Sequence, residues 1–226
     1  MDEKDSTISG VWREALGIIR RYPATVIAPG AVLGALAEAP TYFIADRLLL
    51  DQFLTYLTAA FAYYLYLAYI EGLTTDSESG RDLDTSGSVV GRLLQAVSFV
   101  PRVLVAALVN VSLASAATGL LVVPGVWLFT RWSLSTPVIC KEDRGPVESL
   151  RCSNALVRGR FWFVFGTATL AFFSEEVIIH AGALTSGAIT GSHTWGEWIG
   201  GSIVAALAIP LSALTTSLAY SELRKD

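Results

Sequence analysis

Six apolar stretches divide this 226-residue chain, and they constrain its fold more than any other feature. A helix needs roughly 20 apolar residues to cross about 30 Å of hydrocarbon, and several of the stretches reach that length. They lie at residues 23–44, 52–70, 103–122, 125–140, 161–181 and 198–220. The sequence therefore predicts an all-α, polytopic integral membrane protein with six transmembrane helices, in which residues 1–226 form a single membrane domain.

The basic residues predict how these helices are oriented. Of the 16 Lys and Arg residues, 14 fall on the side that would hold both termini. Arg47 lies in an opposite loop, and Arg131 lies inside the fourth stretch. Because cytoplasmic loops carry an excess of Lys and Arg, we expect both termini to be cytoplasmic. The net charge of -4 makes nucleic acid an unfavourable partner.

Three segments outside the apolar stretches have the pattern of amphipathic helices at the cytoplasmic membrane surface. They are residues 7–21, 88–100 and 146–160, and each precedes two apolar stretches, which suggests a unit repeated three times. Pro23 should end the first of these helices and start the next at a new angle. Residues 72–88 are rich in Ser, Asp, Gly and Glu, so we expect a disordered cytoplasmic loop there.

The first apolar stretch has a second interpretation as a cleavable signal peptide. Arg20 and Arg21 precede the apolar run, and a small-residue segment at 35–37 resembles a cleavage site. Pro29 within the run and the apolar residues that continue to Ala45 favour a retained helix. The orientation of the other five helices is the same in either case.

The second apolar stretch is unusually rich in tyrosine, with five Tyr residues between positions 56 and 69. A buried tyrosine hydroxyl needs a hydrogen-bond partner. Packing and interfacial anchoring explain this pattern, and the polar wall of a cavity is the alternative.

Five ionisable residues fall within predicted spans, where each needs a partner or a hydrated cavity. They are Glu38, Arg131, Glu175, Glu176 and His180, and helix rise places them in the outer half of the membrane. We expect Arg131 to pair with Glu38 or Glu176 around an outward-facing pocket, with His180 at its edge. A purely structural ion pair between three helices explains the same residues, and proton-coupled chemistry is a third interpretation.

Catalytic and metal-binding patterns are weak in this sequence. His180 has no second His or Cys at ligand spacing, so we expect no metal site and no cofactor. Cys140 and Cys152 form neither a disulfide framework nor a close metal pair. Glu175 and Glu176 diverge by about 100° on a helix, which argues against a shared acid and base role. No phosphate-binding loop or nucleophile elbow occurs, so we expect no enzymatic activity.

Residues 124–166 resemble a six-helix membrane domain of prokaryotes that is sometimes fused to glycerophosphodiester phosphodiesterases and also occurs alone. The matching positions are Pro124, Gly125, Arg131, Pro137, Leu150, Ser153, Leu156, Val157, Gly159, Arg160, Phe161 and Trp162. The resemblance implies a multi-pass protein of the prokaryotic plasma membrane. This chain lacks the soluble phosphodiesterase domain, so the resemblance does not carry that activity over.

These patterns favour a non-enzymatic membrane protein that organises or contacts lipids or a membrane partner. A transporter or permease component for a small anionic solute or lipid headgroup is the alternative, and it requires a hydrated cavity that reaches Arg131. An intramembrane enzyme is third, and it requires Glu176 and His180 to share a cavity with another acid or base. Residues 146–160 could contact either anionic lipid or a protein partner. The sequence does not define an oligomeric state.

Overall fold

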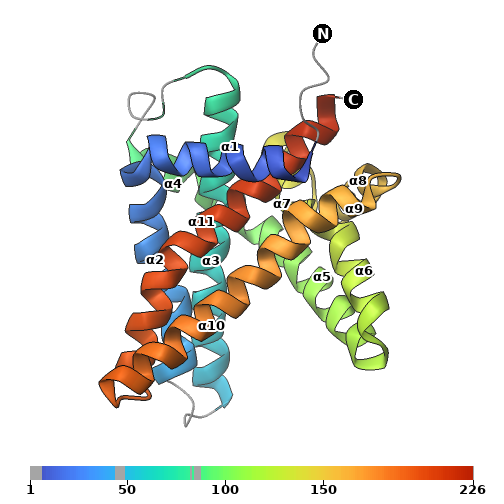
Figure 1. The fold of residues 1–226 in the computed structure, drawn as a ribbon. Coiled ribbons are helices and arrows are strands. Elements are labelled where there is room, and N and C mark those ends of the chain that lie inside the picture. The colour runs from blue at the N-terminus through green and yellow to red at the C-terminus, as the bar shows by residue number, and fades with distance from the viewer. Residues whose placement is uncertain (1–6, 44–48, 82, 84–87, 226) are drawn as a thin grey trace.

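The computed structural model describes residues 7–43, 49–81, 83 and 88–225, and within these ranges the fold is entirely helical. This confirms the predicted all-α class. The elements are α1 (Ile8–Arg21), α2 (Pro23–Phe43), α3 (Leu49–Glu78), α4 (Val89–Val97), α5 (Val100–Leu120), α6 (Val122–Trp132), α7 (Ser135–Glu142), α8 (Pro146–Val157), α9 (Phe161–Val164), the π-helical turn η1 (Phe165–Thr169), α10 (Leu170–Thr190) and α11 (Trp195–Lys225). Figure 1 shows that α1 and the end of α11 lie at the same end of the molecule.

Helices α1 and α2 are separated by a sharp bend at the position that the sequence predicts. The Thr7 side chain caps the start of α1 by accepting a hydrogen bond from the Gly10 N–H at 3.3 Å. The two helix axes differ by 95°, because Pro23 has no backbone N–H and cannot continue the hydrogen bonds of α1. Helix α1 therefore lies across one end of the molecule while α2 runs along its length (Figure 1).

Helices α2, α3, α10 and α11 form the main bundle. Its core contains fully buried large side chains, among them Tyr66, Ile70, Leu73 and Leu214. Helices α10 and α11 approach closely where glycines face each other, since a Cβ on Gly200 would lie only 2.6 Å from the Gly182 carbonyl oxygen. Small residues permit this distance between helix backbones in a membrane. The α9–η1–α10 segment extends to Thr190, well beyond the predicted end at residue 181.

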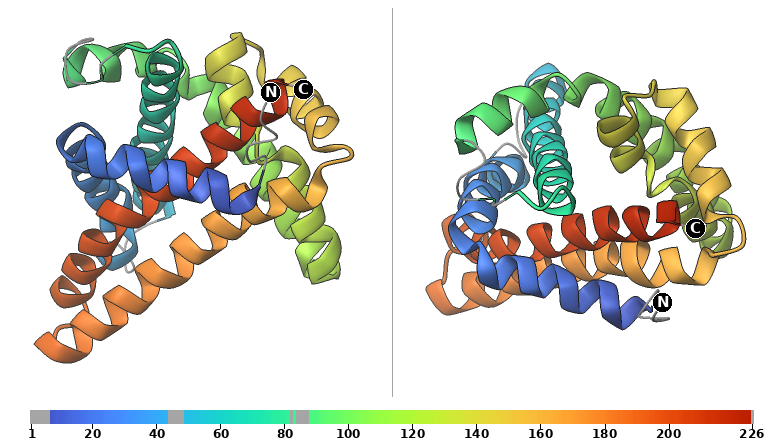
Figure 2. Two further views of the ribbon diagram at one scale, coloured as in Figure 1. Left: turned by 45° about the horizontal axis from the view of Figure 1, so that its top comes forward. Right: turned by 90° about the horizontal axis from the view of Figure 1, so that it is seen from above.

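Helices α5 and α6 form a hairpin whose tip diverges from the main bundle (Figures 1 and 2). The predicted fourth span, 125–140, is not one helix but the separate helices α6 and α7. Pro137 has no backbone N–H, so it cannot donate the α-helical hydrogen bond to the carbonyl four residues earlier. The Leu134 N–H instead donates to Ser153 Oγ of α8 at 3.2 Å, and that hydroxyl donates to the Arg131 carbonyl at 2.8 Å. Ser153 therefore bridges the break.

The three predicted amphipathic segments correspond to α1, α4 and α8. Helix α1 precedes α2 and α3, α4 precedes α5 and α6, and α8 precedes the α9–η1–α10 segment and α11. The prediction of a disordered loop over 72–88 was wrong for residues 72–78, which continue α3. Leu73 is fully buried there, and the Thr74 and Thr75 hydroxyls donate to the Glu71 carbonyl at 3.0 and 2.9 Å. Residues 82 and 84–87 of that prediction, like Arg47, lie outside the described residues.

Three of the described helical segments are long and apolar enough to cross a membrane: Val100–Gly119, Phe161–Thr190 and Trp195–Lys225. The bent pair Ile8–Arg21 and Pro23–Ala39 passes the same test if it is counted as one broken span. The apolar helices are thus compatible with a membrane protein with three spans, or four if the bent pair is one of them, and the predicted six spans and cytoplasmic termini stay predictions.

Candidate functional site

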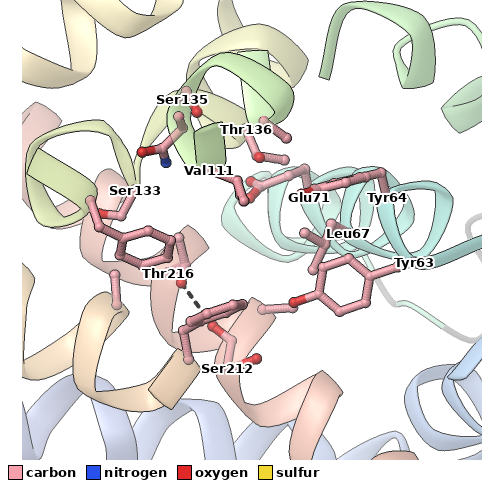
Figure 3. A pocket seen from close by; sticks show the side chains of 16 residues that line it. Tyr63, Tyr64, Leu67, Glu71, Val111, Ser133, Ser135, Thr136, Ser212 and Thr216 are labelled. Carbon is pink, nitrogen blue, oxygen red and sulfur yellow. Dashed lines mark hydrogen bonds between the residues drawn. The ribbon is translucent and has the colours of Figure 1, made fainter. Parts of the chain in front are cut away.

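A central cavity of about 100 Å³ lies where the main bundle meets α5, α6 and α7. Its polar lining comes from helices α3, α5, α7 and α11 and from the turn between α6 and α7, and it includes a carboxylate, an amide and several hydroxyls (Figure 3). These polar residues are Tyr63, Tyr64, Glu71, Asn110, Ser133, Ser135, Thr136, Ser212 and Thr216. Tyr63 and Tyr64 thus form part of a cavity wall. Tyr66 and Tyr69 instead pack in the core and donate to the Val26 and Thr25 carbonyls at 3.0 and 2.7 Å.

Glu71 is the acidic residue of this cavity, and its side chain is held by α11. Its relative exposure is only 3%, and its Oε2 accepts a hydrogen bond from Ser217 Oγ at 2.6 Å. Ser217 Oγ also lies 2.6 Å from Thr74 Oγ1. Lys141 is the neighbouring cation, but its Nζ donates to Glu78 Oε1 and Ser221 Oγ, each at 2.9 Å. No described Lys or Arg nitrogen forms an ion pair with Glu71, so the buried carboxylate lacks a direct counter-charge from these residues.

Asn110 lines the same cavity from α5 and presents an unpaired acceptor. Its relative exposure is 7%, and no described group donates a hydrogen bond to its Oδ1. A buried amide oxygen without a partner loses the hydrogen bonds that water would supply. The cavity therefore combines an unpaired acceptor with a carboxylate, and both groups favour a positively charged or proton-donating occupant.

Four of the five predicted site residues lie near one another on α2 and α10. Glu175 is buried, accepts a hydrogen bond from Ser212 Oγ, and lies 3.5 Å from the Tyr63 hydroxyl. Glu38 interacts electrostatically with both Glu176 and His180. The exposed His180 uses Nδ1 to contact the Glu176 carbonyl at 2.8 Å and the Glu176 carboxylate at 3.9 Å.

This acidic group is distinct from the central cavity. Neither Glu176 nor His180 belongs to the cavity lining, and Glu175 reaches it only through Ser212 and Tyr63, which do. The predicted grouping of Glu38, Glu176 and His180 therefore exists as a cluster, but without the arginine that we expected at its centre.

Arg131 lies elsewhere, and the pairing that the sequence suggested with Glu38 or Glu176 is not formed. Its guanidinium stacks 4.4 Å from the ring centre of Trp127, one turn earlier on α6. Arg131 lines a groove of about 400 Å³ between α5, α6 and α8, here named the Arg131 groove. The groove is lined by Val105, Val109, Trp127, Leu128, Arg131, Trp132, Pro146, Val147, Leu150, Arg151 and Asn154. Arg131 and Arg151 are the charged residues in this described lining, and both are cationic.

Sequence reasoning missed Glu71 and Asn110. Glu71 directly follows the second apolar stretch and precedes the predicted loop, so it is not among the ionisable residues of the predicted spans, although it lies seven and eight residues after Tyr64 and Tyr63 on the same helix. Asn110 is the one amide side chain of the third apolar stretch, and that isolation was the available signal. Neither residue has a neighbour in sequence that reveals the cavity, because its walls come from separate helices.

Within the described ranges, no three His, Cys, Asp or Glu side chains are grouped as ligands for a metal ion, and Cys140 and Cys152 are free thiols. No family model, curated protein or solved structure matches this chain.

Proposed function

We propose that this chain is a non-enzymatic, six-span protein of the prokaryotic plasma membrane that binds anionic phospholipid in the Arg131 groove. The observation that carries the proposal is the pair Arg131 and Arg151 in a groove whose other described lining is mostly Trp, Val, Leu and Pro. Guanidinium groups bind phosphate through charge-assisted hydrogen bonds. Apolar walls beside them suit an acyl chain, so one anionic lipid satisfies both parts of the groove.

The proposed topology places this groove at a membrane interface. Four crossings would be the three long apolar helices and α2 of the bent α1–α2 pair, and α3 and the broken pair α6–α7 would supply the other two. Both termini would be cytoplasmic, as the distribution of basic residues favours. Helix α8 would then lie along the cytoplasmic surface, with Arg151 at headgroup level. Arg131, which lines the same groove near the end of α6, would lie toward the cytoplasmic side and not in the outer half that helix rise predicted. Trp127 and Trp132 are suited to the same interface.

The other proposed functions receive less support from the geometry. A carrier for an anionic solute would use a cavity that reaches Arg131, whereas the described lining of the central cavity contains Glu71 and no Lys or Arg. An intramembrane enzyme would need Glu176 and His180 in a cavity with a further acid or base, and the central cavity is lined by neither. A protein partner at residues 146–160 stays a prediction, as does the resemblance to the six-helix membrane domain.

Native mass spectrometry of the gently extracted protein tests the lipid proposal. Arg131→Gln combined with Arg151→Gln should lower the retention of phosphatidylglycerol about tenfold and leave phosphatidylcholine unchanged, because only the anionic headgroup uses the two guanidiniums. Arg158→Gln is a matched control, since Arg158 follows α8 and is outside the described groove lining. Equal phosphatidylglycerol retention by wild type and the folded double variant would contradict the proposal. A loss of folded yield in Arg131→Gln, with lipid retention unchanged in Arg151→Gln, would instead assign Arg131 a structural role.

A further inference from the structure

We propose that the central cavity binds a small monovalent cation through the Glu71 carboxylate and the Asn110 amide oxygen, in competition with a proton on Glu71. This site is separate from the Arg131 groove, and the inference does not rest on lipid binding. A carboxylate at 3% exposure is strongly disfavoured unless a proton or a cation neutralises it. The described residues provide no Lys or Arg ion-paired with Glu71, and the neighbouring Lys141 is engaged by Glu78, so a proton or a bound cation would supply the neutralising charge.

The oxygen atoms around the cavity define the class of that occupant. Carboxylate, amide carbonyl and hydroxyl oxygens are ligands for hard cations. Glu71 supplies one negative charge to the described lining, which one monovalent cation would balance. Asn110 Oδ1 supplies a second oxygen that has no partner within the protein, and Thr136 and Thr216 supply hydroxyls (Figure 3). A cation would satisfy both the unpaired charge and the unpaired acceptor.

The hydroxyls beside Glu71 can accommodate both of its protonation states. When Glu71 is ionised, Ser217 donates to its carboxylate and Thr74 donates to Ser217. When Glu71 is protonated, it can donate to Ser217, Ser217 can donate to Thr74, and Thr74 can donate to the Glu71 carbonyl at 3.0 Å. Each arrangement uses every hydroxyl proton once. Exchange of a proton for a cation therefore requires only that two hydroxyls rotate.

Glu71 also has a route to one end of the molecule. It lines both the central cavity and a second cavity of about 360 Å³ between α3 and α4. That second cavity contains Asp76 and Arg92, which form an ion pair at 3.4 Å. Glu71 therefore borders both cavities. A cation could reach it from the end of the molecule where α1 and α4 lie (Figure 1).

The groups around Glu71 do not themselves supply the proposed pH response. Helix α7 contributes Cys140 and Lys141, helix α3 contributes Glu78, and α4 contributes Arg92 through the second cavity. Lys141 is engaged by Glu78, and Arg92 by Asp76. Helix α11 faces Glu71 with the uncharged Ser217. The carboxylate of Glu71 is therefore the group whose protonation should compete with the cation.

Thermal unfolding of the full-length protein in lipid nanodiscs provides the test. Chlorides of sodium, potassium and lithium are compared with choline chloride at equal ionic strength, at about pH 8 and about pH 5. At the higher pH at least one inorganic cation should raise the unfolding temperature relative to choline. The increase should vanish at the lower pH, where a proton occupies Glu71. Absence of any difference from choline at either pH would overturn the proposal.

Two variants and a control locate the effect. Glu71→Gln should abolish the cation response, whereas Glu176→Gln, an intramembrane control outside the cavity lining, should retain it. Asn110→Leu keeps the carboxylate and removes the unpaired oxygen, so it should weaken the apparent cation affinity about tenfold. If Glu71→Gln does not fold, the Asn110→Leu result decides. In that case, a wild-type cation response in Asn110→Leu would overturn the proposal. If both variants fold, a wild-type cation response in both would overturn it.

Discussion

The main bundle and the α5–α6 hairpin are both apolar, but the main bundle buries more large side chains inside the protein than the hairpin does. In the main bundle, Ile70, Leu73 and Leu214 are completely buried against neighbouring helices. In the hairpin, Leu108 and Val123 are 68% and 78% exposed. The bundle therefore has the larger internal core, and both regions present apolar side chains that suit lipid tails, such as Val177 of α10 and Ile203 of α11 in the bundle. Residues of the hairpin line both the central cavity, where they meet the main bundle, and the Arg131 groove, where they meet α8.

A matched pair of leucine substitutions should give the largest contrast between the two regions. Leu73→Ala removes a fully buried side chain from the bundle and should lower the free energy of unfolding by about 3 kcal/mol, because it leaves a cavity. Leu108→Ala, the same change in the hairpin, should alter it by less than about 0.5 kcal/mol. Denaturant titration in mixed micelles measures both values. Equal losses would show that the hairpin is packed against protein in the membrane.

Sequence reasoning was most successful where a single residue dictates local geometry. Pro23 predicted the break before α2, and periodicity predicted the helices α1, α4 and α8. It failed where a distant residue decides the outcome. The division of the fourth stretch into α6 and α7 depends on Ser153 of α8, which no local pattern near Pro137 reveals. Arg131 stacks on Trp127 rather than meeting a carboxylate, because depth along a helix does not fix the direction of a side chain.

Ser153 provides the second largest expected effect, since it stabilises the break between the hairpin helix α6 and α7. Ser153→Ala leaves the Leu134 N–H and the Arg131 carbonyl without this partner and should lower the free energy of unfolding by about 2 kcal/mol. Ser79→Ala is the matched control, because that exposed hydroxyl bonds only to the Thr75 carbonyl of its own helix. The same denaturant titration applies. An equally small effect at both serines would mean that α8 does not stabilise the break.

The smallest expected effect concerns Glu142, which joins α7 to the end of α11 just beyond the fourth apolar stretch. Partial burial acts to raise the pKa of this carboxyl, but hydrogen bonds from Tyr220 and Arg224 and the charges of Arg224 and Arg144 outweigh it, so the pKa lies below its ordinary value. Tyr220 donates to Glu142 Oε1 at 2.5 Å, and Arg144 Nε lies 2.7 Å from Oε2. The contact therefore connects the main bundle to α7 through charge.

A carboxyl with a lowered pKa in the folded state stabilises the protein above the pKa of the unfolded chain. This contribution should disappear as the pH falls through the lowered value, since protonation then removes the attraction to Arg224 and Arg144. Because both arginines are partly exposed, solvent limits the contribution to about 1 kcal/mol. In Glu142→Gln, the free energy of unfolding should fall less as the pH is lowered through this range, and its pH dependence above the range should be unchanged. An equal fall in Glu142→Gln and wild type would show that other carboxylates, and not this link between α7 and α11, set the acid sensitivity of the fold.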